Sequence, residues 1–146
     1  MPFYDNLDVI DYLYTKLTTE RSALGLGFVG YADEELLPSY PAAVLSSGSL
    51  AREVHSTVYF KNEILVDIFI LHARLTTSRK ARTREDLLLC RAIVLSLHGD
   101  RTLGGNIVDG HVASEVPGEV RDEQGEAVVG TRITWYGQTR EPTRRP

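Results

Sequence analysis

The apolar positions near the N-terminus recur at steps of three and four residues, which is the spacing of one face of a helix. Asp5 or Asn6 can cap this helix, and it should end before Gly25 and Gly27. The pattern therefore predicts a helix over residues 5–17 with one apolar face. The apolar positions are Leu7, Ile10, Leu13, Tyr14 and Leu17.

Short β-type segments follow this helix. Phe28–Tyr31 and Tyr40–Leu45 are predicted strands. Pro41 places the second at a sheet edge or at the start of a strand, because proline cannot donate a ladder hydrogen bond. The small polar run at residues 46–49 predicts a turn.

The centre of the chain predicts an antiparallel hairpin. Arg52–Phe60 alternates between two faces in the manner of a strand, and residues 61–63 are the predicted turn. Ile64–Arg74 has the strongest β pattern and is apolar on both faces. Since only a central strand covered on both sides is this apolar, we expect it at the middle of the sheet.

The clearest helix is predicted over Glu85–Leu97, between a cap at Ser78 or Thr83 and Gly99 just past its end. Its residues are apolar nearly all round, and a helix of this kind is buried on more than one side. The sheet can cover one side of this helix, and we expect the other side to contact a neighbouring subunit. The narrow polar stripe of this helix consists of Arg84, Arg91 and His98.

Strands return in the last third of the chain, over Val108–Val120 and Glu126–Tyr136, with a turn at residues 122–125. The order helix, strands, helix, strands predicts an α+β fold in which an antiparallel or mixed sheet packs against two main helices. We expect a single domain over residues 1–137 and a polar tail containing Arg and Pro over residues 138–146.

The composition of the 146 residues is that of an ordinary globular protein, with 42% apolar and 25% charged residues. The formal net charge of −4 argues against a dedicated nucleic-acid binder, which is usually basic. No apolar run approaches the ~20 residues of a membrane helix. Cys90 is the one cysteine, which rules out an internal disulfide, and no signal peptide is evident, so a reducing cytosol is the expected compartment.

None of the residue patterns predicts a catalytic centre. The histidines at positions 55, 72, 98 and 111 lack metal-ligand spacing, and Cys90, inside an apolar run, is expected to be a small buried side chain. Asp67 interrupts the apolar strand, so we expect it at the edge of a face or beside an arginine such as Arg132 or Arg91. The sequence therefore predicts a protein that is not an enzyme, without catalytic residues, metal or cofactor.

Charges of opposite sign are segregated along the chain. Basic residues crowd the predicted loop before the second long helix, and acidic residues crowd the C-terminal hairpin. Such blocks are either solvated faces or complementary patches that meet between identical subunits in a ring. The predicted subunit or partner interface consists of Arg79, Lys80, Arg82, Arg84 and Arg91.

Four segments carry a resemblance to a known family. They are the helix Asp5–Leu17, the strand Ile64–Ile70, the helix Glu85–Leu97 and the closing strand Thr131–Tyr136. In order and size they resemble the tail terminator, or tail-completion, proteins of long-tailed bacteriophages. The resemblance covers most of the chain and is carried by layout, without a diagnostic motif.

The resemblance implies an α/β sandwich that assembles as a homo-hexameric ring on the last ring of the tail tube protein. Such a ring stops tube polymerisation and provides the surface that joins the head-completion or connector protein. It lies in the virion, at the neck, after assembly in the host cytoplasm. DNA passes through its lumen without sequence-specific binding, and an acidic lumen would keep phosphates from sticking. The candidate lining residues are Glu115, Glu119, Asp122 and Glu123.

Two other functions remain open on the sequence. Another neck protein, such as a head-completion adaptor or stopper, would occupy the same part of the virion. A small non-viral binding module would use the basic cluster between Arg74 and Arg84 on an acidic partner or nucleic acid. Steeply salt-dependent binding of nucleic acid would favour the module.

Overall fold

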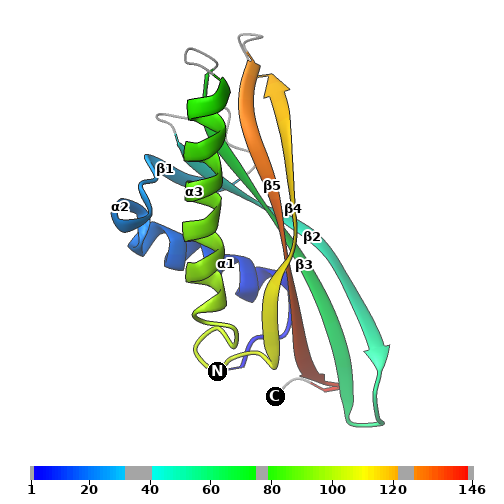
Figure 1. The fold of residues 1–146 in the computed structure, drawn as a ribbon. Helices are drawn as coiled ribbons and strands as arrows, with labels where there is room; N and C mark the ends of the chain where they lie inside the picture. Colours follow the sequence, from blue (N-terminus) through cyan, green and yellow to red (C-terminus); the bar gives the residue numbers. More distant parts are fainter. Residues whose placement is uncertain (1, 32–40, 75–78, 122–126, 145–146) are drawn as a thin grey trace.

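A computed structural model describes residues 2–31, 41–74, 79–121 and 127–144. The elements follow the order helix, strands, helix, strands, and the predicted α+β class is confirmed (Figure 1). The helices are α1 Asn6–Thr19, α2 Arg21–Leu24 and α3 Arg79–His98; the strands are β1 Phe28–Tyr31, β2 Ala42–Val54, β3 Tyr59–Arg74, β4 Asp109–Arg121 and β5 Ala127–Pro142.

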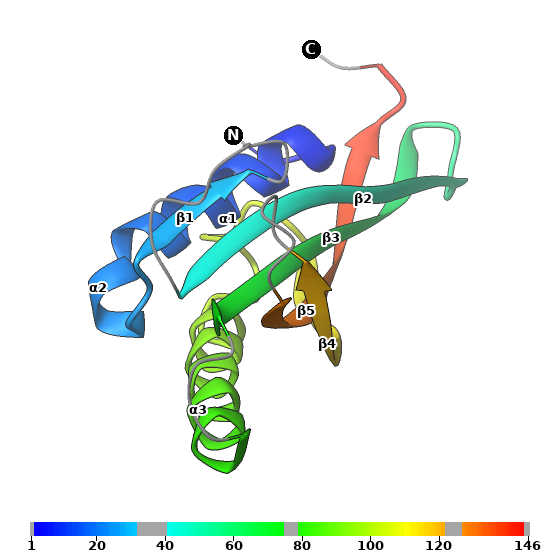
Figure 2. The same cartoon turned by 90° about the horizontal axis from the view of Figure 1, so that it is seen from above.

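The strands form one mixed sheet in the order β1-β2-β3-β5-β4. β1 runs parallel to β2, and the other neighbouring pairs are antiparallel. The most apolar strand, β3, is central, as predicted. Figures 1 and 2 show a strongly twisted sheet whose β2–β3 hairpin extends at one end beyond the helices.

The core lies between one face of this sheet and the two long helices. Alternate residues of β3 are fully buried there, whereas Leu65, Phe69 and Leu71 on the opposite face are only half-buried. The prediction that this strand is covered on both sides is therefore wrong for the single chain, because α1 and α3 both pack on the same face. The buried cluster includes Ile64, Val66, Ile68 and Ile70 of β3, Val9, Leu13 and Leu17 of α1, and Ile93 and Leu97 of α3.

The predicted turn at residues 46–49 is wrong, because β2 continues through it. The pairing of β2 with β3 shifts in register between Ser47 and Leu50, as at a β-bulge. A Cβ at Gly48 would lie 2.5 Å from the carbonyl oxygen of Leu65. The glycine here therefore permits two backbones to approach closely and does not reverse the chain.

The predicted turn at residues 61–63 is also wrong, because these residues lie inside β3. The chain turns between Val54 and Tyr59 instead. There the hydroxyl oxygen of Ser56 accepts hydrogen bonds from the backbone N–H groups of Val58 and Tyr59, at 3.2 and 3.1 Å. Serine turns of this kind are weaker sequence signals than Gly or Pro, so the polar run that follows was the more conspicuous candidate.

β5 extends to Pro142, so the predicted polar tail is wrong over residues 138–142, which pair with β3. The polar side chains of this segment have partners. Buried Thr139 donates to the carbonyl oxygen of Tyr4 at 2.9 Å, and buried Glu141 accepts from Arg52 Nε at 2.9 Å. The composition of this segment is that of a solvated tail. Its hydrogen-bond partners, which the composition does not reveal, allow it to pair as a strand.

Both long helices begin and end at recognisable signals. Asp5 caps α1, because its side chain accepts the backbone N–H of Asp8 at 3.3 Å. α3 begins at Arg79, earlier than predicted, and stops before Gly99 as expected. The short α2 was not predicted, and it ends at Gly25, whose φ of 80° favours glycine.

Trp135 of β5 is fully buried over two glycines. Gly110 and Gly137 lie opposite each other in the β4–β5 ladder. A Cβ on either residue would come within 2.2 Å of the indole ring. The two glycines therefore leave the flat space that the ring occupies, and packing on this side of the sheet is tight.

Candidate assembly surfaces

The four histidines lie at separate positions in the fold. His55 is exposed in the β2–β3 turn, whereas His72 is buried near the other end of β3. His98 accepts a backbone hydrogen bond from β4 at 2.9 Å, and His111 lies on β4 itself. Within the described residues, no group of three or more His, Cys, Asp or Glu side chains is placed to hold a metal ion.

A polar chain of side chains runs from α3 to the sheet. His72 Nδ1 lies 3.1 Å from Asp86 Oδ1 on α3, and its Nε2 lies 3.3 Å from Thr131 Oγ1 on β5. Burial raises the pKa of the Cys90 thiol, and the hydrogen bond with Thr131 opposes this effect only in part. A neutral buried thiol is a poor nucleophile. Asp86 and Thr131 contact the two ring nitrogens of His72, and these contacts link α3 to the sheet.

Asp67 lies on the face of the sheet away from the helices. The hydroxyl of Thr134, its cross-strand neighbour on β5, donates to Asp67 Oδ1 at 3.0 Å. Within the described residues, Asp67 is bonded to Thr134 and to neither of the expected arginines, Arg132 and Arg91, so that part of the expectation is wrong. A partly exposed carboxylate with a hydroxyl donor avoids the cost of a buried unpaired charge.

The solvent side of α3 carries a row of leucines and arginines. Leu87, Leu88 and Leu95 are 65%, 46% and 64% exposed. Arg84 and Arg91 lie on the same side at helical spacing, and both are exposed. These five residues are called the α3 stripe below. The sequence predicted that this helix is buried on a second side. In the single chain that second side is the exposed α3 stripe.

The predicted basic interface overlaps this stripe in part. Arg84 and Arg91 belong to it and are separated by leucines. Arg79, Lys80 and Arg82 lie in the first turns of α3, but their side chains fall outside the part of the structure that is described. The described part of the predicted interface is thus two arginines that lie among exposed leucines.

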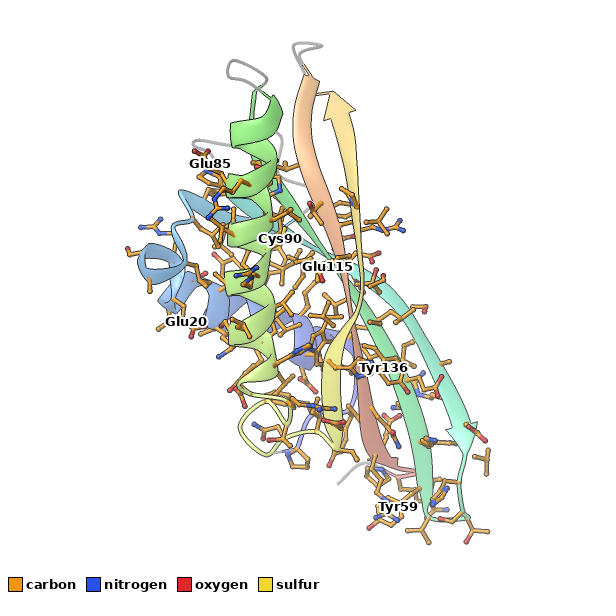
Figure 3. All side chains as sticks on the ribbon, viewed as in Figure 1. Glu20, Tyr59, Glu85, Cys90, Glu115 and Tyr136 are labelled. Carbon is orange, nitrogen blue, oxygen red and sulfur yellow. The ribbon has the colours of Figure 1, made fainter. Side chains whose placement is uncertain are left out.

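Of the predicted acidic group, only the side chain of Glu115 is described. Glu115 lies on β4 and is exposed (Figure 3). Glu119 lies further along β4, and its side chain is outside the described part, as are Asp122 and Glu123 altogether. The acidic hairpin therefore stays a prediction.

The far end of the sheet forms an arm that the sequence analysis missed. The arm consists of residues 50–63 and 137–142, where β2, β3 and β5 pair beyond the helices (Figure 1). Val54 and Val58 near its tip are 73% and 55% exposed. Arg140 lies over the Tyr59 ring at 4.5 Å, and the backbone N–H of Thr143 donates to the Val58 carbonyl at 2.8 Å. The available signal was the pair of β-type runs Arg52–Phe60 and Ile64–Arg74, which predicted a hairpin but not the place of its turn.

A groove of about 380 Å³ lies between α2 and α3, beside the α3 stripe. This volume is within the range of small ligand sites, about 300–1,000 Å³. Its lining contains both apolar side chains and the carboxylates of Glu85 and Asp86. The lining residues are Leu24, Gly25, Pro41, His72, Glu85, Asp86, Leu88, Leu89 and Ala92.

The described helices include none that is long and apolar enough to cross a membrane. No protein-family model and no curated protein matches this sequence. The arguments for function therefore come from the surfaces of the chain itself.

Proposed function

We propose that this chain is a structural subunit that assembles with copies of itself into a ring, the tail terminator of a long-tailed bacteriophage. The observation that carries the proposal is the α3 stripe. It presents three exposed leucines and two arginines along one helix face. Exposed apolar residues that are contiguous and bordered by charge are typical of protein–protein contact surfaces.

Two separate apolar surfaces on one chain support a contact that repeats around a ring. Exposed aliphatic residues occur on α3 and again at the arm tip, and the N-terminal half of α3 and the arm tip lie at opposite ends of the molecule (Figure 1). A contact between two different surfaces of identical subunits is heterologous, and it closes into a ring when the rotation between subunits allows it.

The assignment to the tail end draws on the layout described above. α1, the β2–β3 hairpin, α3 and the closing strand β5 follow the order on which the resemblance rests. In the proposed role the ring contacts the tail tube protein on one side and the head-completion protein on the other, and DNA passes through its hole.

Purified tails provide the direct test. Gold-labelled antibody against this chain should mark the head-proximal end of isolated tails in electron micrographs. Native mass spectrometry of the complex released from them should give six times the 16.3 kDa mass of the chain. Label that stays on filled heads would indicate a stopper or adaptor. A chain that is absent from tails and binds nucleic acid with steep salt dependence would indicate a binding module.

The acidic lumen is a separate part of the proposal. Neutral replacements of the four acidic residues should leave the ring intact, because lumen residues make no subunit contacts. Loss of the ring would place these residues at subunit contacts instead. The replacements are Glu115→Gln, Glu119→Gln, Asp122→Asn and Glu123→Gln.

A further inference from the structure

A hollow of about 280 Å³ lies at the arm, apart from the α3 stripe and from the groove beside that stripe. Its lining comes from the residue after β2, from β3 and β5, and from the residue before β4. Three of the lining residues are basic and none is acidic, so the chemistry of the hollow favours an anion. The lining residues are His55, Phe60, Lys61, Val108, Gln138, Thr139 and Arg140.

The strongest donors of the hollow gather on one face of the arm. Lys61 of β3 and Arg140 of β5 lie directly opposite each other in the ladder, and Gln138 lies two positions before Arg140 on β5. Side chains two residues apart on a strand share a face, so an ammonium, a guanidinium and an amide project together. The intervening Thr139 faces the other way, where its hydroxyl donates to the Tyr4 carbonyl oxygen at 2.9 Å.

Lys61 and Arg140 are like charges at directly opposed positions of the sheet. Like charges opposite each other on neighbouring strands destabilise the pairing. The guanidinium of Arg140 lies over the ring of Tyr59, at 4.5 Å from the ring centroid, near the end of the arm that Tyr59 marks in Figure 3. This cation–π contact orients Arg140 but does not remove the repulsion. An anion between the two cations would remove it.

Two carboxylates share this face of the arm without neutralising the pair. Glu53 of β2 lies opposite Lys61 on its other side, and Glu63 is hydrogen-bonded to Tyr136. Among the ion pairs of the described residues, none joins either glutamate to Lys61 or Arg140. The positive charge of the two side chains is therefore available to a ligand.

We propose that this hollow binds the phosphate group of a small molecule. A phosphate monoester carries about −1.5 to −2 charges at neutral pH, which matches two cations better than a singly charged carboxylate does. The planar guanidinium of Arg140 presents two N–H groups to two phosphate oxygens, and Lys61 adds a compact charge. The volume is slightly below the range of drug-sized ligand sites, about 300–1,000 Å³, so the molecule is small. The site lies within one copy and is independent of the ring.

Titration of the chain with inorganic phosphate at constant ionic strength tests the site. In amide NMR spectra the backbone signals of residues 61 and 138–140 should shift and reach saturation. Arg140→Gln should weaken binding about tenfold, because it removes charged donors. The matched control is Arg132→Gln, an exposed arginine of β5 that does not line the hollow, and it should bind as the wild type does. Acetate should bind about tenfold more weakly than phosphate.

Thermal unfolding gives a second, independent measurement. A ligand that binds only the folded chain raises its melting temperature. Phosphate should therefore stabilise the wild type and Arg132→Gln, and it should leave Arg140→Gln and Lys61→Gln unchanged. Equal stabilisation of all four proteins would overturn the site.

Three results of the NMR titration would also overturn it. They are the absence of a saturable shift with phosphate, equal binding by Arg140→Gln and Arg132→Gln, and a response to a short DNA duplex without any response to inorganic phosphate. The last result would assign the two cations to nucleic acid. These outcomes are distinct from failure of the ring, which is measured on purified tails.

Discussion

α1 and α3 pack on the same face of one sheet, yet they differ in what they leave uncovered. α1 buries Val9, Leu13 and Leu17 and exposes one large aliphatic side chain, Leu7. α3 buries Cys90, Ile93 and Leu97 and exposes three leucines. The sheet covers most of the apolar surface of α1, whereas α3 has more apolar surface than the sheet covers. The difference locates the surface that is free to bind another subunit.

The largest effect should come from replacing one leucine by alanine on each helix. Leu13→Ala removes a fully buried side chain of α1 and should lower the free energy of unfolding by about 2–5 kcal/mol. Leu95→Ala, on the exposed α3 stripe, should change it by at most about 0.5 kcal/mol and should instead weaken assembly. Urea unfolding and native mass spectrometry separate the two effects. Equal destabilisation by both variants would contradict the contrast between the helices.

A second pair of variants tests how tightly the core is packed on the face of the sheet that α3 covers. Loose packing there would be another reason for exposed leucines on α3. Gly137→Ala places a methyl group against the indole of Trp135 and should destabilise the fold by about 1–3 kcal/mol. Gly118→Ala is the matched control on β4, since a Cβ there would meet no atom within 4 Å. A lower melting temperature for Gly137→Ala alone is expected. Tolerance of both substitutions would mean that this side of the core is loose.

The cap of α1 should contribute less than its buried side chains. Asp5→Ala removes the acceptor for the Asp8 backbone N–H and should cost about 1 kcal/mol of unfolding free energy. Asp5→Asn, which keeps a capping oxygen, should recover most of the loss. Thermal unfolding of the three proteins measures this. No difference between wild type and Asp5→Ala would show that packing alone holds the start of α1.

The smallest effect concerns the link between α1 and the segment after α3. Tyr12 donates to Asp100 Oδ2 at 2.5 Å, and this hydrogen bond together with burial raises the pKa of Tyr12 to about 12. A raised phenol pKa means that its stabilisation is complete below about pH 10 and is lost as the pH rises toward 12. The stability difference between wild type and Tyr12→Phe, from urea unfolding, should therefore shrink between pH 10 and 12. A constant difference would rule out this linkage.

Strong local periodicity was sufficient to predict most of the elements. Leu13 and Leu17 repeat at helical spacing on α1, because burial of a single face imposes a regular pattern on the sequence. Ile64 to Ile70 form an almost continuous apolar run, which predicted the central strand β3. Segments with polar or small residues were misassigned. Gly48 and Asn62 resemble turn residues, yet one admits a neighbouring backbone and the other donates to Glu141 inside the arm, and both reasons lie in contacts distant in sequence.

The candidate surfaces divide in the same way. Arg84 and Arg91 were predicted as interface residues because charge and helical spacing are local properties. The arm tip was missed because its exposure depends on where β2, β3 and β5 extend beyond the helices. The partner of Asp67 was also missed, because the register that places Thr134 beside it is set by the whole sheet.

The sequence by itself determined the α+β class, the central place of β3 and the excess of apolar residues on α3, since these follow from the pattern along the chain. Only the tertiary structure decided which apolar residues stay exposed. Both helices cover one face of the sheet, so the solvent side of α3 and the tip of the arm have no cover from the described chain. Burial is a property of the packed whole, and a periodic sequence does not say how many of its faces the same chain can cover.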